Sequence, residues 1–486
     1  MFVRKTKSRN STCFQIGKKQ YGRFILLKHV GCANAPVEIE ALRIKAQEEL
    51  TRIVLEHQLS LFPEQKKQIR AKLLNWHITG FHHVFGAVYD HIGFPDTMLR
   101  DLVIARIVNP KSKTATIRYL NRHIGITFSK DTLYRFLDTL DHDSLTKIAY
   151  SFVSKRNNGI TLIFYDVTTL SFETENEDGV RRKGYSKEHR SDMPQILIGL
   201  FVDSDGYPFD FDVFEGNKFE GHTFKAAVGN LMNKYSFEHL TVVADAGMLS
   251  EDNLSYLTEH HITYIVGARI KNLSNSLKKG ICSHDYTKNG RYGQMVEGKR
   301  LIVDFSPDRA KHDRMNREKL IKKLETRIEK GEQLIRKSKY LLVENTGTVT
   351  GVDQKKIDEE KQFDGLKGYV TTADNSITSE DIVAHYHNLW KVEKAFRMSK
   401  NDLRERPIYH QQLKRIKAHL LLCFVSLLVM KEAERILIQK HYTVEKAVEI
   451  LGTVGQGKIR IGNVQLEIDS ELDQDAQSIL KLFTGH

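Results

Sequence analysis

Between Ile160 and Ile270 the sequence alternates short apolar, β-branched runs with stretches of helical periodicity. The runs TLIFYDVTTLSFE, QILIGLFV and YPFDFDVFEG predict three strands, and DSDG between the last two is a strong hairpin signal. A helix near Phe224–Tyr235, a strand HLTVVAD, a helix capped at Ser250 and a strand ITYIVGARI follow. This order predicts an α/β fold, with a mixed sheet and helices on its faces.

The flanking sequence predicts further segments around this core. Residues 1–30 carry eight Lys and Arg and no acidic residue, so we expect a basic arm over 1–40, with a short hairpin in KKQYGRFILLKHV. We expect a helical DNA-binding region over 41–156 and the first part of the core over 157–270. An insertion subdomain around a highly charged helix should occupy 271–363, and the second part of the core 364–435. For the C-terminal region, 436–486, we consider a role in oligomerisation.

The helical region contains a candidate DNA-reading element. The stretch NPKSKTATIRYLNRHIGITFSKDTLYRFLDTL predicts two short helices about a turn, with Ser129 and Asp131 as candidate caps of the second. It fits either a helix-turn-helix-like reader or a plain helical bundle with charged faces, and both interpretations stay open. We expect that removing residues 1–150 abolishes specific DNA binding and leaves the sheet folded.

Charge and cysteine usage narrow the class of protein. A net charge of +13 favours a polyanionic partner such as nucleic acid, although many basic proteins bind none. The four cysteines lie far apart without a CxxC pair, which argues against a zinc finger or a disulfide framework and fits a reducing, intracellular compartment. The N-terminus lacks the apolar region of a signal peptide. The longest apolar stretch, AHLLLCFVSLLVM, is too short to span a bilayer, so we expect a buried helix and no membrane partner.

Three carboxylates stand at positions where a site could form. Asp166 ends the apolar run LIFYD and Asp245 ends TVVAD; each alone is usually a turn or cap residue. The stretch YHNLWKVEKAFRMSK predicts a helix, on which Tyr386, Glu393 and Lys400 share one stripe because residues seven apart nearly eclipse. Glu393 is flanked by two aromatic residues, Trp390 and Phe396, that we expect to be buried.

Three carboxylates at one sheet edge would repel one another unless a cation neutralised them. Oxygen-only ligands suit Mg²⁺ or Mn²⁺, and substrate phosphates and water complete the shell of such an ion. Such an arrangement fits two-metal phosphoryl transfer. The alternative is that Glu393 is only a surface ion-pair partner of Arg397, which leaves the aromatic flanks unexplained.

The element order, with Asp on the first strand, Asp after the fourth and Glu on a later helix, resembles that of ribonuclease H-like nucleotidyl transferases. The Glu helix resembles that of bacterial insertion-sequence transposases of the DDE class, in the Tn-five-like and IS-four-like superfamily. Their signature is Tyr, two residues, Arg, three residues, Glu, six residues, Lys. Tyr386, Glu393 and Lys400 match it, whereas Leu389 replaces the Arg and Arg397 is the substitute we consider. The stretches YDVTTLSFE, GYSKEHRSDMPQILIGLFVDSDGYPFDFDVFEGN and VVADAGMLSEDNL are also similar to the superfamily's first catalytic blocks.

The resemblance implies a ribonuclease H-like mixed sheet flanked by helices, with an inserted subdomain and a helical N-terminal region. It implies a transposase that cuts element ends and joins them to target DNA, with Asp166, Asp245 and Glu393 holding two Mg²⁺ or Mn²⁺ ions. Tyr386 and Lys400 would contact DNA near the cut.

From the basic loop after the first strand we add Lys183, Lys187, His189 and Arg190 as candidate DNA contacts, each equally interpretable as part of a solvated loop. The expected partners are double-stranded DNA and a second copy in the DNA complex, in a bacterial or archaeal cytoplasm. A related nuclease without strand transfer and a catalytically inactive DNA-binding descendant remain alternatives.

Overall fold

The structure is a computed structural model of the chain. It describes residues 1–8, 11–60, 71–174, 176–185, 192–248, 250–288, 290–330, 339–343, 349–406, 408, 410 and 412–483. The chain divides into two compact units. The first comprises Met1–Leu74 and Lys458–Leu466, and the second comprises Asn75–Gly457 and Glu467–His486.

The first unit contains an antiparallel sheet and a long helix. Its elements are β1 (Phe2–Lys7), β2 (Thr12–Gln20), β3 (Arg23–Ala33) and α1 (Pro36–Ser60), with the strands in the order β1-β2-β3. The turn between β2 and β3 places Tyr21 and Gly22 at φ 52° and 79°, as a two-residue hairpin turn requires. The hairpin expected in the basic arm is therefore confirmed.

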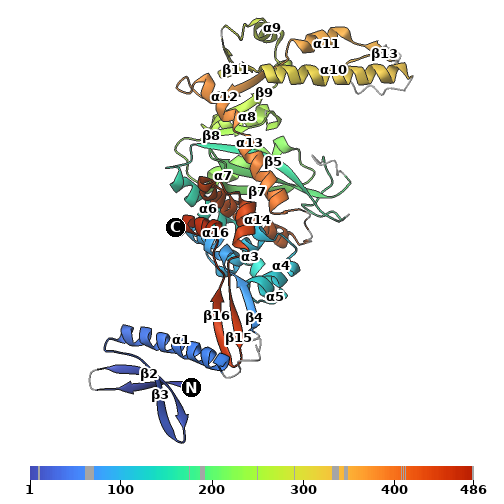
Figure 1. Cartoon of the computed structure of the whole chain (residues 1–486). Coiled ribbons are helices and arrows are strands. Elements are labelled where there is room, and N and C mark those ends of the chain that lie inside the picture. Colours follow the sequence, from blue (N-terminus) through green and yellow to red (C-terminus); the bar gives the residue numbers. More distant parts are fainter. Residues whose placement is uncertain are drawn as a thin grey trace. The chain divides into compact units, whose positions relative to one another are not determined.

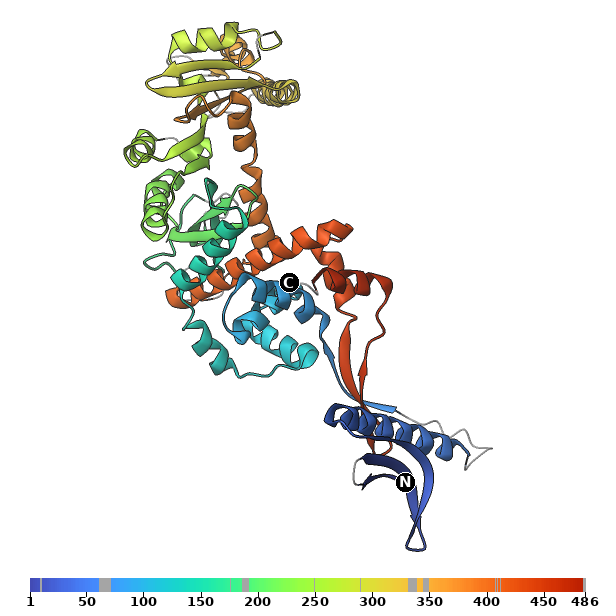
Figure 2. The same cartoon turned by 90° about the vertical axis from the view of Figure 1, so that its left-hand side faces the viewer.

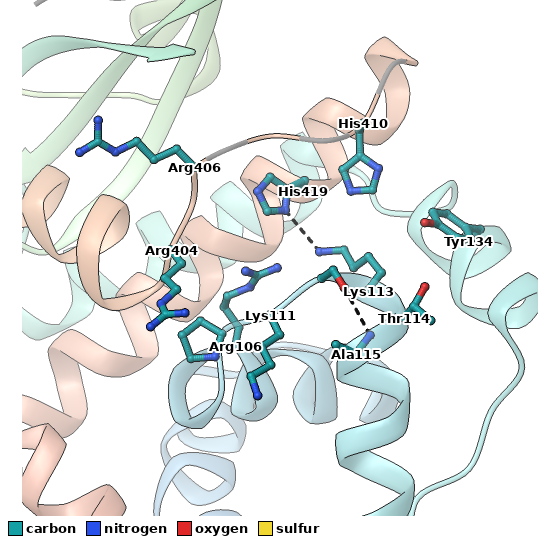
Figure 3. Close-up of a pocket in the computed structure, with 12 residues that line it drawn as sticks. Arg106, Lys111, Lys113, Thr114, Ala115, Tyr134, Arg404, Arg406, His410 and His419 are labelled. Atoms are coloured by element: carbon teal, nitrogen blue, oxygen red, sulfur yellow. Dashed lines mark hydrogen bonds between the residues drawn. The ribbon is translucent and has the colours of Figure 1, made fainter. Parts of the chain in front are cut away.

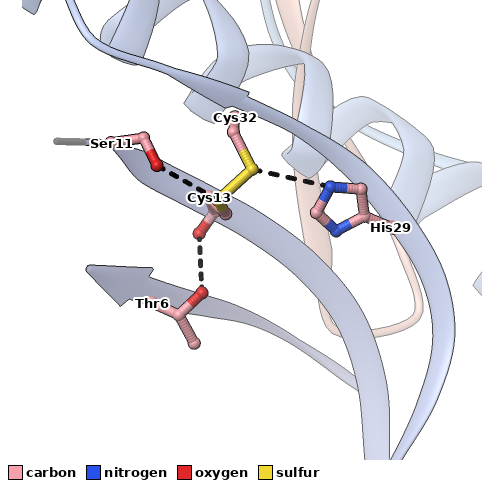
Figure 4. The surroundings of a disulfide bond; sticks show 5 residues. All are labelled: Thr6, Ser11, Cys13, His29 and Cys32. Carbon is pink, nitrogen blue, oxygen red and sulfur yellow. Dashed lines mark hydrogen bonds between the residues drawn. A yellow bond between two sulfur atoms is a disulfide. The ribbon is translucent and has the colours of Figure 1, made fainter. Parts of the chain in front are cut away.

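Two sequence-based expectations about this end of the chain are wrong. Cys13 and Cys32 are directly paired in the β2–β3 ladder and form a disulfide, with His29 Nε2 3.6 Å from Cys32 Sγ (Figure 4). Sequence spacing did not reveal this pair because strand pairing, and not chain proximity, brings the two cysteines together. The range 41–156 is not helical throughout, because β4 (Ala71–Ile78) is a strand in a second sheet, ordered β16-β15-β4, with β15 (Gly455–Ile461) and β16 (Val464–Asp469).

An eight-stranded mixed sheet lies in the second unit (Figure 1). In sequence order its strands are β5 (Leu162–Ser171), β6 (Gln195–Asp203), β7 (Pro208–Glu215), β8 (Thr241–Ala244), β9 (Thr263–Ala268), β10 (Tyr292–Val296), β11 (Lys299–Phe305) and β14 (Leu366–Thr371). Their order in the sheet is β10-β11-β14-β9-β8-β5-β6-β7. β5, β8 and β9 are parallel neighbours, and β6 and β7 continue the sheet antiparallel. The predicted ribonuclease H-like mixed sheet is confirmed.

Helices cover the sheet and link it to the N-terminal helices. They are α6 (His142–Arg156), α7 (Glu220–Lys234), α8 (Glu251–Glu259), α12 (Ser379–His387), α13 (Trp390–Arg397) and α14 (Leu413–Leu437). α14 packs against β7 on one side and against α3 (Thr97–Val108) on the other (Figure 2). Its apolar run is buried on all sides for this reason. None of the helices in the described ranges has the length and apolarity needed to cross a membrane.

The N-terminal helices share the hydrophobic core of the sheet. They include α2 (Ala87–Ile92), α3, α4 (Lys113–Tyr119), α5 (Lys130–Leu137) and the π-helical turns η1 (His82–Gly86) and η2 (Leu120–Ile124). Ser129 caps α5 as predicted, since its Oγ accepts from Thr132 N at 3.0 Å. Phe85, Val103 and Leu137 belong to the same buried cluster as the strands, so removing residues 1–150 would take away part of the core on which the sheet packs, contrary to what we expected.

The inserted segment is only partly separate from the sheet. It contains α9 (Asn275–Ser283), α10 (Pro307–Glu329), β12 (Leu341–Val343), β13 (Val349–Val352) and α11 (Gln354–Lys361). Leu324, Tyr340, Leu341 and Ile357 form its small core. β10 and β11, in contrast, extend the main sheet through β14. Short helical turns η3 (Ala246–Met248) and η4 (Ile270–Asn272) follow β8 and β9, and η5 (Met398–Asp402) follows α13. Near the C-terminus, η6 (Ile438–Lys440), α15 (Val444–Leu451) and α16 (Gln474–Phe483) complete the described elements.

Candidate active site

Parallel strand pairing places two of the predicted carboxylates next to each other. In the β5–β8 ladder, Tyr165 pairs with Ala244, and Asp166 and Asp245 are the next residues of the two strands. β8 ends there, whereas β5 continues to Ser171, so Asp166 is an internal strand residue opposite Leu200 of β6 and not a strand end as expected. Because β8 stops at Ala244 while β5 continues, Asp166 and Asp245 lie side by side where β8 ends.

The helix expected over residues 386–400 is broken into three pieces. α12 ends at His387, α13 runs from Trp390 to Arg397, and the π-helical turn η5 follows. Tyr386 and Glu393 therefore lie on different helices, and the π-turn changes the register before Lys400. Phe396 is buried as expected, but Trp390 is 51% exposed, so that part of the expectation is wrong.

The three carboxylates line one cavity of about 500 Å³. Asp166 comes from β5, Asp245 from the end of β8 and Glu393 from the first turn of α13. Asp245 and Glu393 are exposed and Asp166 is half-buried, so all three are accessible to a substrate entering the cavity. Tyr386 and Lys367 also line it, the latter from β14.

Tyr386 fixes the position of Asp245. Its hydroxyl donates a hydrogen bond to Asp245 Oδ1 at 2.9 Å. Burial, together with the Asp245 carboxylate, raises the pKa of Tyr386 far above its ordinary value, so the hydroxyl keeps its proton and remains a donor.

Lys367 is a cavity residue that the sequence did not single out. Its ammonium lies 4.4 Å from the centre of the Tyr386 ring. Burial lowers the pKa of Lys367, while Asp245 and Glu393 act in the opposite direction, so the lysine is electrostatically coupled to both carboxylates. The sequence feature that could have identified Lys367 is its position in DGLKGYVTTA, the predicted strand that precedes α12.

The other predicted DNA contacts fall into three groups. Lys400 does not line the cavity; its Nζ donates to Thr168 Oγ1 at 2.7 Å and to Thr169 O at 2.9 Å, and so holds η5 against β5. Arg397 is exposed on α13 and lies outside the cavity lining. Lys187 and Arg190, with His189, lie outside the described residues.

The donor chemistry of the cavity fits a hard divalent cation, because its three acidic side chains supply oxygen ligands only. In the described ranges no three His, Cys, Asp or Glu side chains are grouped so that they could hold one ion together. Mg²⁺ commonly binds one or two carboxylates and takes its remaining ligands from water and substrate phosphates. An ion in this cavity would therefore need ligands from water or other groups in addition to these side chains.

A sequence profile described as the transposase DDE domain matches residues 157–429, more than half of the chain. The chain belongs to this family. The matched range includes Asp166, Asp245 and Glu393 together with all of the described insertion.

Solved structures with some likeness to this member of the transposase DDE domain family are also transposases. A piggyBac transposase synaptic complex with hairpin DNA has 10% identity and a TM-score of 0.38, with 77% of this chain and 76% of that chain covered. A Mos1 transposase paired-end complex with the left transposon end has 11% identity and a TM-score of 0.16, over 37% of this chain and 56% of that one. Comparison with curated protein sequences finds no match.

Proposed function

We propose that this chain is an insertion-sequence transposase that cuts the ends of its element and joins them to target DNA by two-metal phosphoryl transfer. The observation that carries the proposal is that Asp166, Asp245 and Glu393, separated by 79 and 148 residues, line one cavity. Unrelated surface carboxylates have no reason to meet in this way. Membership of the transposase DDE domain family supports the same reaction class.

Each cavity residue has a definite task in this proposal. Asp166, Asp245 and Glu393 would hold Mg²⁺ or Mn²⁺, which when bound supply an activated water and charge stabilisation at the leaving oxygen. Tyr386 orients Asp245 through its hydroxyl, and Lys367 offers a cation to the phosphate being cut. Lys400, which lies outside the cavity lining, positions η5 through its bonds to β5.

The wider partners follow from the same proposal. Double-stranded DNA is the substrate, and the DNA-bound state is a homodimer that holds two element ends. Arg397, exposed on α13, contacts the DNA strand outside the cavity. The basic first unit, with the helices around α4 and α5, contributes to recognition of the ends.

The test is cleavage of a labelled element-end duplex by purified Glu393→Gln. The substitution keeps the shape of an exposed side chain and removes its charge, so DNA binding and thermal stability should persist. Cleavage should fall by several orders of magnitude, at about 1.4 kcal/mol of transition-state stabilisation per tenfold loss.

Glu380→Gln is the matched control. Glu380 forms an exposed ion pair with Arg291 at the start of α12, so its loss should change stability by less than about 1 kcal/mol and leave cleavage unchanged. Wild-type cleavage by Glu393→Gln would refute the assignment of Glu393. Cleavage by the unmodified protein without joining of 3′-OH ends to target DNA would instead favour a nuclease. No cleavage at all, with DNA binding retained, would favour an inactive DNA-binding descendant.

A further inference from the structure

A second cavity lies in the second unit, which we call the catalytic unit, and basic and neutral side chains line it (Figure 3). It has a volume of about 570 Å³, within the range of sites that bind small molecules. Five cationic side chains line it, and none of its described lining residues is acidic. The five are Arg106, Lys111, Lys113, Arg404 and Arg406. We call this cavity the basic pocket.

Two of these cations are buried and held in place without a carboxylate. Arg106 and Lys113 are 6% and 5% exposed, and among the described residues Arg106 donates to the carbonyl oxygen of Leu403 and Lys113 contacts His419, neither of which is acidic. Lys113 Nζ lies 3.3 Å from His419 Nδ1, and the three side chains point toward one another (Figure 3). Burying a cation without an anion is costly, and burial together with the Arg106 charge lowers the pKa of Lys113 to about 7. An anionic ligand would favour the charged form of this lysine.

The His419 ring is neutral and accepts a hydrogen bond from Lys113. Its Nε2 lies 2.9 Å from the carbonyl oxygen of Glu405 and must carry the proton that is donated there. Nδ1 is then left to accept from the Lys113 ammonium. Burial, followed by the Lys113 and Arg106 charges, lowers the pKa of His419 well below its ordinary value, in agreement with a neutral ring.

The carboxyl group of Glu405 offsets little of the positive charge of the basic pocket. Glu405 is 6% exposed and interacts electrostatically with Arg106, but burial raises its pKa. Its Oε2 accepts a hydrogen bond from Ser399 Oγ at 2.7 Å, so it is turned toward η5. The basic pocket therefore retains a net positive charge.

The basic pocket is tied to the catalytic cavity through the segment that follows α13. Lys400 holds η5 to β5 at Thr168 and Thr169, which follow Asp166 on the same strand. A few residues later, Arg106 donates to the carbonyl of Leu403 at 3.4 Å and His419 donates to that of Glu405. One short stretch of chain thus carries Glu393 at one end and forms a wall of the basic pocket at the other.

We propose that the basic pocket binds a phosphate group of the DNA strand that occupies the catalytic cavity. Arg106 and Lys113 supply charge-assisted hydrogen bonds to phosphate oxygens, and the exposed Lys111 and Arg404 extend the contact along the backbone. This inference rests on the proposed function, because it takes DNA to be the substrate. A bound phosphate would also hold the segment that carries Glu393 in one position.

The test measures how DNA affinity depends on salt. Binding of a short fluorescent duplex to the full chain is followed by anisotropy over a range of salt concentrations, for Lys113→Met, Lys111→Gln and Arg404→Gln. Loss of one phosphate contact should reduce the slope of log affinity against log salt by about 1. Lys147→Gln, which removes an exposed lysine of α6 outside the basic pocket, is the matched control and should leave the slope unchanged.

The outcomes separate this inference from the proposed function. Unchanged slopes for all three pocket variants would overturn it, and so would an equal loss in Lys147→Gln, because the effect would then be general. Lys111 and Arg404 are exposed, so those two variants decide the matter even if Lys113→Met fails to fold. Divalent-dependent cleavage by the unmodified protein tests the proposed function separately.

A second probe distinguishes the source of the phosphate. Inorganic phosphate alone is titrated into the unmodified protein and Lys113→Met by calorimetry. Binding that depends on Lys113, combined with unchanged DNA slopes, would show that the ligand is a free phosphate and would overturn the assignment to DNA.

Discussion

Tyr386 is the residue through which the catalytic cavity controls the position of one of its carboxylates. Its hydroxyl donates to Asp245 Oδ1, and its ring contacts both the Tyr369 ring and the Lys367 ammonium. A carboxylate held in this way is oriented before a metal arrives, which lowers the cost of binding.

Replacing Tyr386 by Phe should therefore weaken metal use more than it weakens folding. Loss of the hydroxyl removes the hydrogen bond that orients Asp245. Substitution of a residue that hydrogen-bonds to a metal ligand typically costs 10- to 100-fold in metal affinity or activity. We expect the Mg²⁺ concentration for half-maximal cleavage to rise by about that factor, while stability falls by about 1 kcal/mol. Mg²⁺ titrations of cleavage and thermal unfolding measure the two effects.

Tyr369→Phe provides a matched control for this experiment. Tyr369 is an equally buried tyrosine, 4.9 Å from Tyr386 between ring centres, and its hydroxyl is paired with His387 and not with a carboxylate. Its Mg²⁺ requirement should stay close to that of the unmodified protein. Equal shifts in both variants would contradict a specific role for the Tyr386–Asp245 bond.

At the level of elements, the β6–β7 hairpin contains a buried acid at its turn. Asp203 is 1% exposed, and its Oδ1 accepts from the backbone amides of Asp205 and Tyr207 at 3.0 and 2.7 Å. Burial raises the pKa of Asp203 to about 6, despite these hydrogen bonds. The sequence DSDG predicted the turn, but the burial of Asp203 in the folded chain decides the pKa of this acid.

This hairpin should give the protein a pH-dependent stability. Because the folded pKa lies above the ordinary value of 3.8, the stabilising contribution is complete below about pH 4 and is lost as the pH rises through about 6. Two pKa units correspond to about 3 kcal/mol. In denaturant titrations, the free energy of unfolding should decline over this range in the unmodified protein relative to Asp203→Asn.

Asp205→Asn tests whether the effect belongs to Asp203. Asp205 is exposed in the same turn and pairs with Arg156, so this variant should keep most of the decline. Asp212, whose pKa burial also raises to about 6, is present in all three proteins and cancels from the comparison. An undiminished decline in Asp203→Asn would contradict the assignment.

At the scale of the whole molecule, the division into units differs from the one expected. The N-terminal helices belong to the core of the sheet, and the first unit is limited to the strands β1–β3, α1 and short adjoining segments. Removing residues 1–74 takes away β1–β3, α1 and the first half of β4, and it spares the core helices that a deletion of residues 1–150 would remove.

Removal of residues 1–74 should leave the thermal transition of the catalytic unit unchanged, because its buried core lies between Phe81 and Phe483. DNA affinity should fall and depend less steeply on salt, since the deletion removes the basic strands of the first unit. Calorimetry and anisotropy titrations of the truncated protein measure both. Loss of the thermal transition would contradict the prediction about stability. Unaltered DNA binding would contradict the prediction about affinity.

The sequence by itself determined the features that depend on neighbouring residues. Alternation of β-branched residues placed β5–β9, the DSDG turn placed the β6–β7 hairpin, and Ser129 marked the start of α5. The three acidic positions were also evident, because each follows or interrupts an apolar pattern.

Contacts between distant parts of the chain decided the rest. Parallel pairing of β5 with β8 puts Asp166 beside Asp245, pairing of β2 with β3 joins Cys13 to Cys32, and β14 brings Lys367 into the cavity. The break between α12 and α13 likewise places Tyr386 and Glu393 on separate helices, although the local pattern favoured one. Local periodicity carries no information about which strands become neighbours, because that choice minimises the free energy of the whole core and not of any single segment.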